Sequence, residues 1–338
     1  MGLFGPAWKS KNEAKAIAAV QKITDENELR TVVLNGRGNA AIEALRRIQS
    51  QEFLQEAAQD APDPKVRLAC AERLTDSNAL RKLVRTERDQ NVRKSLSDLL
   101  WKKEFESADR LMQSGNLFAA AKAFWEIQWG DAAKKKFEEC IDSISLEAKA
   151  QIDRGQYKEA HARLAAVYQT FKLTITPVHP KWKGEKIQYD NNFFCYCYGL
   201  ASTYLQDFKG YQVGFCVYQK EEYRIALLQK AYEAGVRLME HGDYQNAIEW
   251  FEDLQHYCSH HAYKDVLPAE DIDRKYDECR TKWRNDPANP DYCPASEDHW
   301  HSYELIDSDY PPDKTVGWEK KRCKNCGKTV TEEVGLFW

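Results

Sequence analysis

The sequence predicts a mainly α-helical protein, an α-solenoid of stacked helix pairs with a small β domain at its C-terminal end. One pattern recurs every 25 or 26 residues within the first hundred residues, and a second, glycine-centred pattern recurs in the middle of the chain. A Cys-x-x-Cys-Gly motif lies close to the end. Glycine and proline are scarce, at 16 and 11 of 338 residues, which favours helix.

The first pattern lies in residues 1–104, which we expect to form one helical domain. AIAAVQKITDENELRTVV, AAIEALRRIQSQEFLQEAA and KVRLACAERLTDSNALRKLV align on the apolar residues Ile23, Ile48 and Leu74. Apolar side chains three and four residues apart predict a first helix with one buried face. An N-cap residue then opens a second helix in each copy; these residues are Asp25, Ser50 and Asp76. The units resemble HEAT-like repeats over about residues 14–104, and this resemblance implies fold rather than chemistry.

The second pattern defines a middle region, residues 105–285. ADRLMQSGNLFAAAKAF, AKAQIDRGQYKEAHARL and AGVRLMEHGDYQNAIEWF align on Gly115, Gly155 and Gly242. The glycine permits a tight turn between two helices, and an alanine five residues later allows the helices to approach closely. This pattern resembles the tetratricopeptide repeat. An aromatic-rich insertion at about residues 173–223 interrupts it, and either forms a working face or packs its aromatics along a helix.

The C-terminal region, residues 286–338, carries the spacing of a metal site. Cys323 and Cys326 supply half of a ligand set, and Cys293 with a nearby histidine supplies the other half. Two segments with strand character lie between these halves, so the region resembles a zinc ribbon. Thiolate and imidazole ligands favour Zn²⁺, and four protein ligands make such a site structural. We expect Zn²⁺ on Cys293, His299, Cys323 and Cys326, with His301 as the alternative to His299.

The remaining cysteines and histidines predict no second site. Cys195 and Cys197, like most other cysteines of the chain, fit buried thiols. The cluster in HYCSHHAY fits the end of a helix better than a metal site; its members are His256, Cys258, His260 and His261. No nucleophile elbow, phosphate-binding loop or HExxH motif is present, so nothing favours an enzyme.

The features together favour a non-enzymatic scaffold or adaptor that binds a protein or peptide partner, because helical-repeat arrays expose long binding surfaces. Trp250, Phe251 and Tyr257 are either anchors for that partner or core residues. No apolar run approaches the roughly 18 residues of a membrane helix, and the N-terminus lacks a signal-peptide core. We therefore expect a cytoplasmic protein with no membrane contact.

A nucleic-acid-binding protein is the alternative. Residues 1–104 carry 19 Lys and Arg against 15 Asp and Glu, and several of these cations could form one basic stripe. The candidates are Arg46, Arg47, Arg67, Arg81, Lys82, Arg85, Arg88 and Arg93. The C-terminal region, with 6 basic against 11 acidic residues, argues against phosphate binding.

Overall fold

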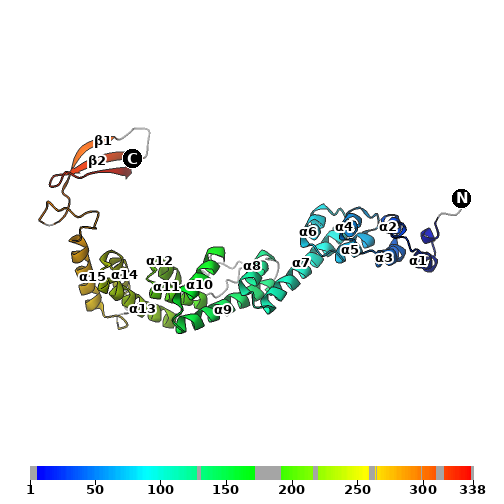
Figure 1. The fold of residues 1–338 in the computed structure, drawn as a ribbon, viewed down its shortest axis with the longest axis horizontal. Helices are drawn as coiled ribbons and strands as arrows, with labels where there is room; N and C mark the ends of the chain where they lie inside the picture. Colours follow the sequence, from blue (N-terminus) through cyan, green and yellow to red (C-terminus); the bar gives the residue numbers. More distant parts are fainter. Residues whose placement is uncertain are drawn as a thin grey trace, which may run out of the picture. The chain divides into compact units, whose positions relative to one another are not determined.

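The computed structural model describes residues 6–127, 131–171, 192–215, 220–258, 263, 265–297, 299–309 and 316–335. The chain divides into two compact units, unit 1 (Met1–Ser143) and unit 2 (Ile144–Trp338). The described residues form fifteen α-helices that pack in consecutive order and one three-stranded antiparallel sheet near the C-terminus (Figure 1). The predicted mainly α fold of stacked helices with a small C-terminal β element is confirmed.

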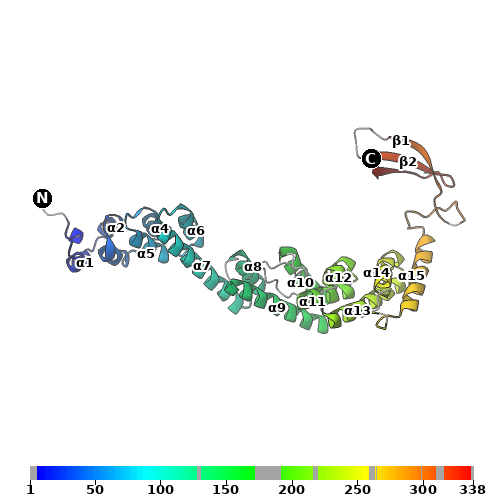
Figure 2. The ribbon, with the colours of Figure 1, turned by 180° about the vertical axis from the view of Figure 1, so that it is seen from behind.

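Unit 1 begins with a short 3-10 helix and continues as a run of α-helices. Its elements are η1 (Ala7–Lys9), α1 (Glu13–Gln21), α2 (Glu26–Asn35), α3 (Gly38–Leu45), α4 (Gln51–Asp60), α5 (Pro64–Glu72), α6 (Ser77–Thr86), α7 (Gln90–Gln113), α8 (Leu117–Ile127) and the first part of α9 (Asp131–Asp153). Helices α1, α3, α5 and α7 pack in sequence as one layer, and α2, α4 and α6 pack as a second layer (Figures 1 and 2).

The repeat positions deduced from the sequence form the core and the caps of these layers. Ile48 is fully buried, and Ile23 and Leu74 are 8% and 2% exposed. The predicted N-caps of α2, α4 and α6 each accept a hydrogen bond from a backbone N–H of the first helical turn; they are Asp25, Ser50 and Asp76. The sequence period therefore reports the stacking period of the helices directly.

A basic side chain links each first helix to the repeat before it. Arg73 donates hydrogen bonds to the carbonyls of Leu45 and Ile48, and Lys103 donates to the carbonyl of Leu74 at 2.7 Å. We call this series of hydrogen bonds between repeats the ladder. Its donors are Arg47, Arg73 and Lys103, and the acceptors at equivalent repeat positions are the carbonyls of Ile23, Ile48 and Leu74. These carbonyls follow the last turn of α1, α3 and α5, where a helix leaves acceptors without internal donors. The ladder satisfies them from the next repeat.

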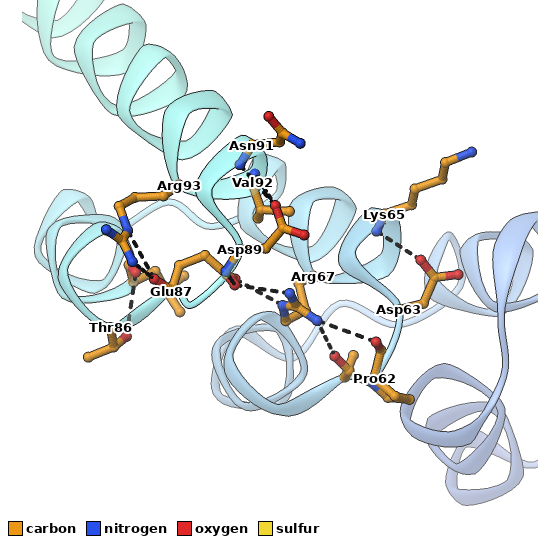
Figure 3. A network of polar contacts seen from close by, with 12 residues as sticks. Pro62, Asp63, Lys65, Arg67, Thr86, Glu87, Asp89, Asn91, Val92 and Arg93 are labelled. Carbon is orange, nitrogen blue, oxygen red and sulfur yellow. Dashed lines mark hydrogen bonds and ion pairs between the residues drawn. The ribbon is translucent and has the colours of Figure 1, made fainter.

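A buried ion pair adds a second link, between α5 and the C-cap of α6 (Figure 3). The Arg67 guanidinium meets the Glu87 carboxylate through two hydrogen bonds of 2.9 Å, and the two side chains are only 13% and 5% exposed. Arg67 also donates to the carbonyl of Ala61, and Arg93 donates to the carbonyl of Glu87. Burial favours the neutral acid, but the Arg67 guanidinium and the Asp89 N–H outweigh it and lower the pKa of Glu87.

Helix α7 joins the two kinds of repeat. The expected boundary between residues 104 and 105 falls inside this single helix of 24 residues. Lys103, just past the middle of the helix, completes the ladder, and the C-terminal end of the helix is followed by the turn at Gly115 into α8. Gly115 has φ of +80°, which an L side chain rarely adopts, and Gly155 and Gly242 repeat this conformation at the turns after α9 and before α14.

Unit 2 is also helical over most of its length and ends in the sheet. Its elements are the last part of α9, then α10 (Tyr157–Phe171), α11 (Asn192–Leu205), α12 (Phe208–Gly214), α13 (Glu221–Glu240), α14 (Tyr244–Cys258), α15 (Ala269–Arg284), β1 (Tyr303–Asp309), β2 (Val316–Cys323) and β3 (Thr329–Gly335). Strand β2 lies between β1 and β3 and is antiparallel to both. The expected boundary at residue 286 directly follows Asn285, the C-cap of α15.

The predicted insertion at about residues 173–223 lies partly outside the described residues, including the segment LTITPVHPKWKGEKIQY. The described part, residues 192–215, forms α11 and α12, and most of α11 is buried. The two helices cross at glycines: a Cβ atom built on Gly214 would lie 2.3 Å from Gly199 Cα and 2.7 Å from the Cys195 carbonyl oxygen. This backbone contact requires glycine at position 214.

Replacing Arg73 with alanine is expected to destabilise unit 1, because the carbonyls of Leu45 and Ile48 lose their donor. We expect the free energy of unfolding to fall by about 1.5–3 kcal/mol, the range for hydrogen bonds to charged groups. Urea unfolding, together with hydrogen exchange at the amides of α3 and α5, measures the effect. Arg88→Ala is the matched control, since Arg88 is exposed and has no partner among the described residues. Equal losses in both variants would contradict the ladder.

The substitution Gly214→Ala is expected to separate α11 from α12, because the new methyl group meets backbone that cannot rotate away. Overpacking of this kind costs about 1–3 kcal/mol. Thermal unfolding of unit 2 followed by circular dichroism measures the loss. Lys209→Ala changes an exposed position of the same helix and should stay within about 0.5 kcal/mol of the parent protein. A Gly214→Ala protein as stable as that control would show that the helices do not meet at this point.

Candidate metal centre

Cys323 and Cys326 lie in a tight turn between β2 and β3. The Gly327 N–H donates to the Cys323 carbonyl at 2.9 Å, and the Cys323 N–H donates to the Lys328 carbonyl at 2.8 Å. Gly327 has φ of +77°, as expected from its place directly after Cys326. The turn presents both thiols on one side, and Cys323 is buried while Cys326 is exposed.

Cys293 lies in a second turn, formed by residues 292–300. The Cys293 N–H donates to the His299 carbonyl at 2.8 Å, and Tyr292 pairs with Trp300 in an isolated antiparallel bridge. The Lys324 N–H donates to the Ser302 carbonyl at 2.9 Å. This bond holds the two turns together, so that the Cys293 and Cys323 sulfurs are 3.9 Å apart.

The histidine beside these thiols is His301. Its Nδ1 lies 3.3 Å from Cys326 Sγ, and one ligand atom from each of Cys293, His301, Cys323 and Cys326 lies within 4.8 Å of all the others. The strand register explains the position. Tyr303 pairs directly with Cys323, and side chains two residues apart in extended backbone lie on the same side, so His301 faces the thiols.

His299, the histidine expected from the sequence, lies outside this group. It has φ of +57° and closes the first turn, with its carbonyl bound to the Cys293 N–H. Its ring stacks on Tyr292 at a centroid distance of 4.9 Å, and its buried Nδ1 has no hydrogen-bond partner among the described residues. Alternation from Tyr303 would place both His299 and His301 on one face, so the sequence carried no signal that separates them; the positive φ of His299 breaks the extended backbone and leaves His301 beside the thiols.

The distances fit a tetrahedral zinc ion. Zn–S bonds of about 2.3 Å and Zn–N bonds of about 2.0 Å imply S···S and S···N separations of roughly 3.8 and 3.5 Å. The observed 3.9 Å between Cys293 and Cys323 and 3.3 Å between Cys326 and His301 are close to these values. Three thiols and one imidazole are also a donor set that zinc prefers. The residues present therefore fit the metal that the spacing predicted.

The turn around Cys323 also favours the thiolate form. Burial alone would raise the pKa of this thiol, but the N–H groups of Cys326 and Asn325, with further help from His301, lower the pKa of Cys323 to about 6. Burial and the neighbouring thiols raise the pKa of Cys293, because a thiolate at this position would be poorly solvated and close to other thiol groups. A bound divalent ion would stabilise the thiolate form, since it coordinates deprotonated thiols.

Residues 286–335 have almost no apolar core of their own. Their buried residues, among those described, are Asn289, Cys293, Gly317 and Cys323. Leu305 and Val316 are 54% and 45% exposed on the sheet. A small three-stranded sheet needs a covered hydrophobic face or a cross-link to stay folded. Two of the four buried residues belong to the Cys and His cluster, so a bound metal is the available cross-link.

Four of the other cysteines are buried thiols with a strongly raised pKa. Burial raises the pKa of Cys70 and Cys197 to about 12, and that of Cys140 and Cys279 to about 11. His256 and Cys258 end helix α14, whereas Cys216, His260 and His261 lie outside the described residues. No second group of three metal-ligating side chains occurs in the part of the chain that the structure describes.

Two of the three aromatic anchors suggested by the sequence lie in the core, and the third, Tyr257, is partly buried. Trp250 and Phe251 are 1% and 0% exposed, and Tyr257 packs against Phe215 and Tyr263.

Comparison with known proteins identifies no family. No protein-family model and no curated protein matches the chain. Among solved structures, a "Circular tandem repeat protein with novel repeat topology and enhanced subunit contact surfaces" aligns with 82% of this chain at 12% identity and a TM-score of 0.18. The chain spans 57% of that protein's length, and a TM-score this low supports no inference. Within the described residues, no helix has the length and apolarity required to cross a membrane.

Replacing His301 with alanine is expected to release zinc, because the ligand set falls from four to three, whereas His299→Ala should retain it. Zinc content of the purified protein, by mass spectrometry, distinguishes the two variants. Cys326→Ser should also lose the metal and leave the helical circular dichroism signal nearly unchanged, since the helices have their own core. Zinc retained by His301→Ala and lost by His299→Ala would reverse the assignment of the fourth ligand.

Proposed function

We propose that this protein is a non-enzymatic scaffold that binds protein partners along its helical arrays and carries a structural zinc ion near its C-terminus. The observation that supports the scaffold most directly is that each compact unit packs its helices in successive pairs, such as α2 on α3 and α4 on α5 in unit 1 and α13 on α14 and α14 on α15 in unit 2. Arrays of this kind expose one face of each helix over a long distance, which suits the binding of extended partners.

The zinc ion in this proposal is held by Cys293, His301, Cys323 and Cys326. Four protein ligands leave no coordination position for a substrate, so the metal serves folding rather than catalysis. The sparse core of residues 286–335 supports this role, because metal binding contributes folding free energy directly in small domains.

The bonding of the cations in unit 1 favours protein over nucleic acid as the partner. Five of the eight residues in the predicted basic stripe are used inside the fold: Arg46 pairs with Glu43, Arg67 with Glu87 and Arg81 with Glu104, while Arg47 and Arg93 donate to backbone carbonyls. A phosphate backbone needs cations that are free to bind it. Lys82, Arg85 and Arg88 remain, which is a weak basis for nucleic-acid binding.

The absence of an enzymatic role is also part of this proposal. The thiols outside the metal centre have raised pKa values where burial acts on them, which suppresses nucleophilic thiolate. The metal centre, with four ligands, offers no open position. A scaffold accounts for both features without further assumptions.

Co-purification tests the proposal. The full chain, tagged at its N-terminus, is recovered from source lysate with half of the sample treated with nuclease, and an unrelated tagged protein serves as the background control. We expect the same protein partners in both halves, because the contacts are made with protein. Partners that disappear after nuclease treatment would instead favour nucleic acid, and the absence of any specific partner would contradict the scaffold.

A further inference from the structure

A groove of about 600 Å³ lies in unit 1 between helices α6, α7 and α8. Its apolar lining comes from all three helices and consists of Val84, Leu100, Trp101 and Ile127. The volume is in the range of sites that hold small ligands or a few side chains. It lies more than a hundred residues from the metal centre along the chain and belongs to the other compact unit.

The length of α7 creates this groove. Helix α6 packs on α7 as the last second-layer helix of the first array, and α8 packs back on α7 after the turn at Gly115. Phe105 on α7 meets Phe124 on α8 edge to face at 5.4 Å, and Trp101 stacks on Phe105 at 5.1 Å. The floor is therefore held in place by aromatic packing, while α6 and α8 form the walls.

The charges around the groove are not all used by the fold. Arg81 on α6 and Glu104 on α7 form an ion pair of 2.6 Å, so these two charges are paired, although the buried Glu104 Oε1 accepts no hydrogen bond from the described residues. Arg85 on α6, Asp98 on α7 and Glu126 on α8 have no hydrogen bond or ion pair with any described residue. The unpaired charges are thus one guanidinium on the α6 wall, one carboxylate on α7 and one carboxylate on the α8 wall.

We propose that the groove binds a short segment of a partner protein in which an apolar side chain stands next to a lysine or arginine. The apolar side chain enters between Leu100, Trp101 and the α6 wall, where burial of its surface drives binding. The neighbouring cation meets Asp98 and Glu126, and Arg85 donates to backbone carbonyls of the segment. This inference rests on the scaffold function proposed above and names the chemistry of one partner.

The charge balance decides between this partner and its alternatives. An acidic segment would bring its carboxylates toward Asp98 and Glu126, and a nucleic acid would bring phosphates there; both meet like charge. A wholly apolar segment would bring no cation to pair with the two carboxylates, so their charge would contribute nothing to binding. A basic and apolar segment is the one class that complements both the floor and the unpaired carboxylates.

Three fluorescent peptides of equal length test the proposal by fluorescence anisotropy with the full-length protein. They share a central leucine and differ only in the residues flanking it, which are arginine, glutamine or aspartate. We expect the arginine peptide to bind about threefold to tenfold more tightly than the glutamine peptide, as exposed ion pairs allow, and the aspartate peptide to bind most weakly. Added salt should reduce this difference.

The double variant Asp98→Asn, Glu126→Gln should bind the arginine and glutamine peptides equally, while retaining the thermal stability of the parent protein. Glu106→Gln is the matched control, because Glu106 is an exposed carboxylate on α7 that does not line the groove. It should keep the preference for arginine. Equal binding of the three peptides to the parent protein, binding of none of them, or a preference for arginine that survives in the double variant would overturn the inference.

Partner capture with the double variant separates this inference from the scaffold proposal. Loss of specific partners that the parent protein and Glu106→Gln retain supports the groove as their binding site. Partners retained in full by the double variant would refute the groove and leave the scaffold function standing. A parent protein that captures no partner would contradict the scaffold itself, whatever the peptides do.

Discussion

The hydrogen bonds from a basic side chain of one repeat to the end of the preceding first helix govern the architecture of unit 1. When the helices stack, the carbonyls after the last turn of each first helix are removed from water, and a buried carbonyl without a hydrogen-bond donor is unfavourable. Arg47, Arg73 and Lys103 supply those donors from 24 to 31 residues further along the chain. Each bond therefore fixes the register between neighbouring repeats, which apolar contact alone would leave free to slide.

The C-terminal region reaches order by a different physical route. The helical array buries an alanine- and leucine-rich core between layers, so its repeats stabilise one another through area removed from water. Residues 286–335 bury almost no apolar side chain and gather three thiols and an imidazole instead. Under the proposed function, packing stabilises the helices and a bound metal would cross-link the C-terminal region. The helices would then keep their fold without the metal, whereas the sheet would lose its cross-link.

Features that depend on near neighbours in sequence were predictable. The apolar period, the N-caps such as Asp76 and the turn glycines such as Gly115 all act within a few residues, so the pattern alone located them. The role of Arg73 was not predictable, because its acceptors lie more than twenty residues away and nothing in its own segment distinguishes it from a surface cation. The choice of His301 was not predictable for the same reason, since its position beside the thiols depends on the pairing of Tyr303 with Cys323, twenty residues further along the chain.

Charged residues in a repeat array divide into those that the fold uses and those that it leaves free, and only the second set can bind a partner. Arginine is abundant in the first hundred residues, yet most of the predicted basic stripe is bonded within or between repeats. In the groove beside α7, Arg81 and Glu104 pair with each other, and what remains is one unpaired cation and two unpaired carboxylates beside an aromatic floor. Composition alone suggested a basic surface for nucleic acid. The bonding pattern favours a basic and apolar segment as the ligand of this groove, because the cations are already occupied in holding the repeats together.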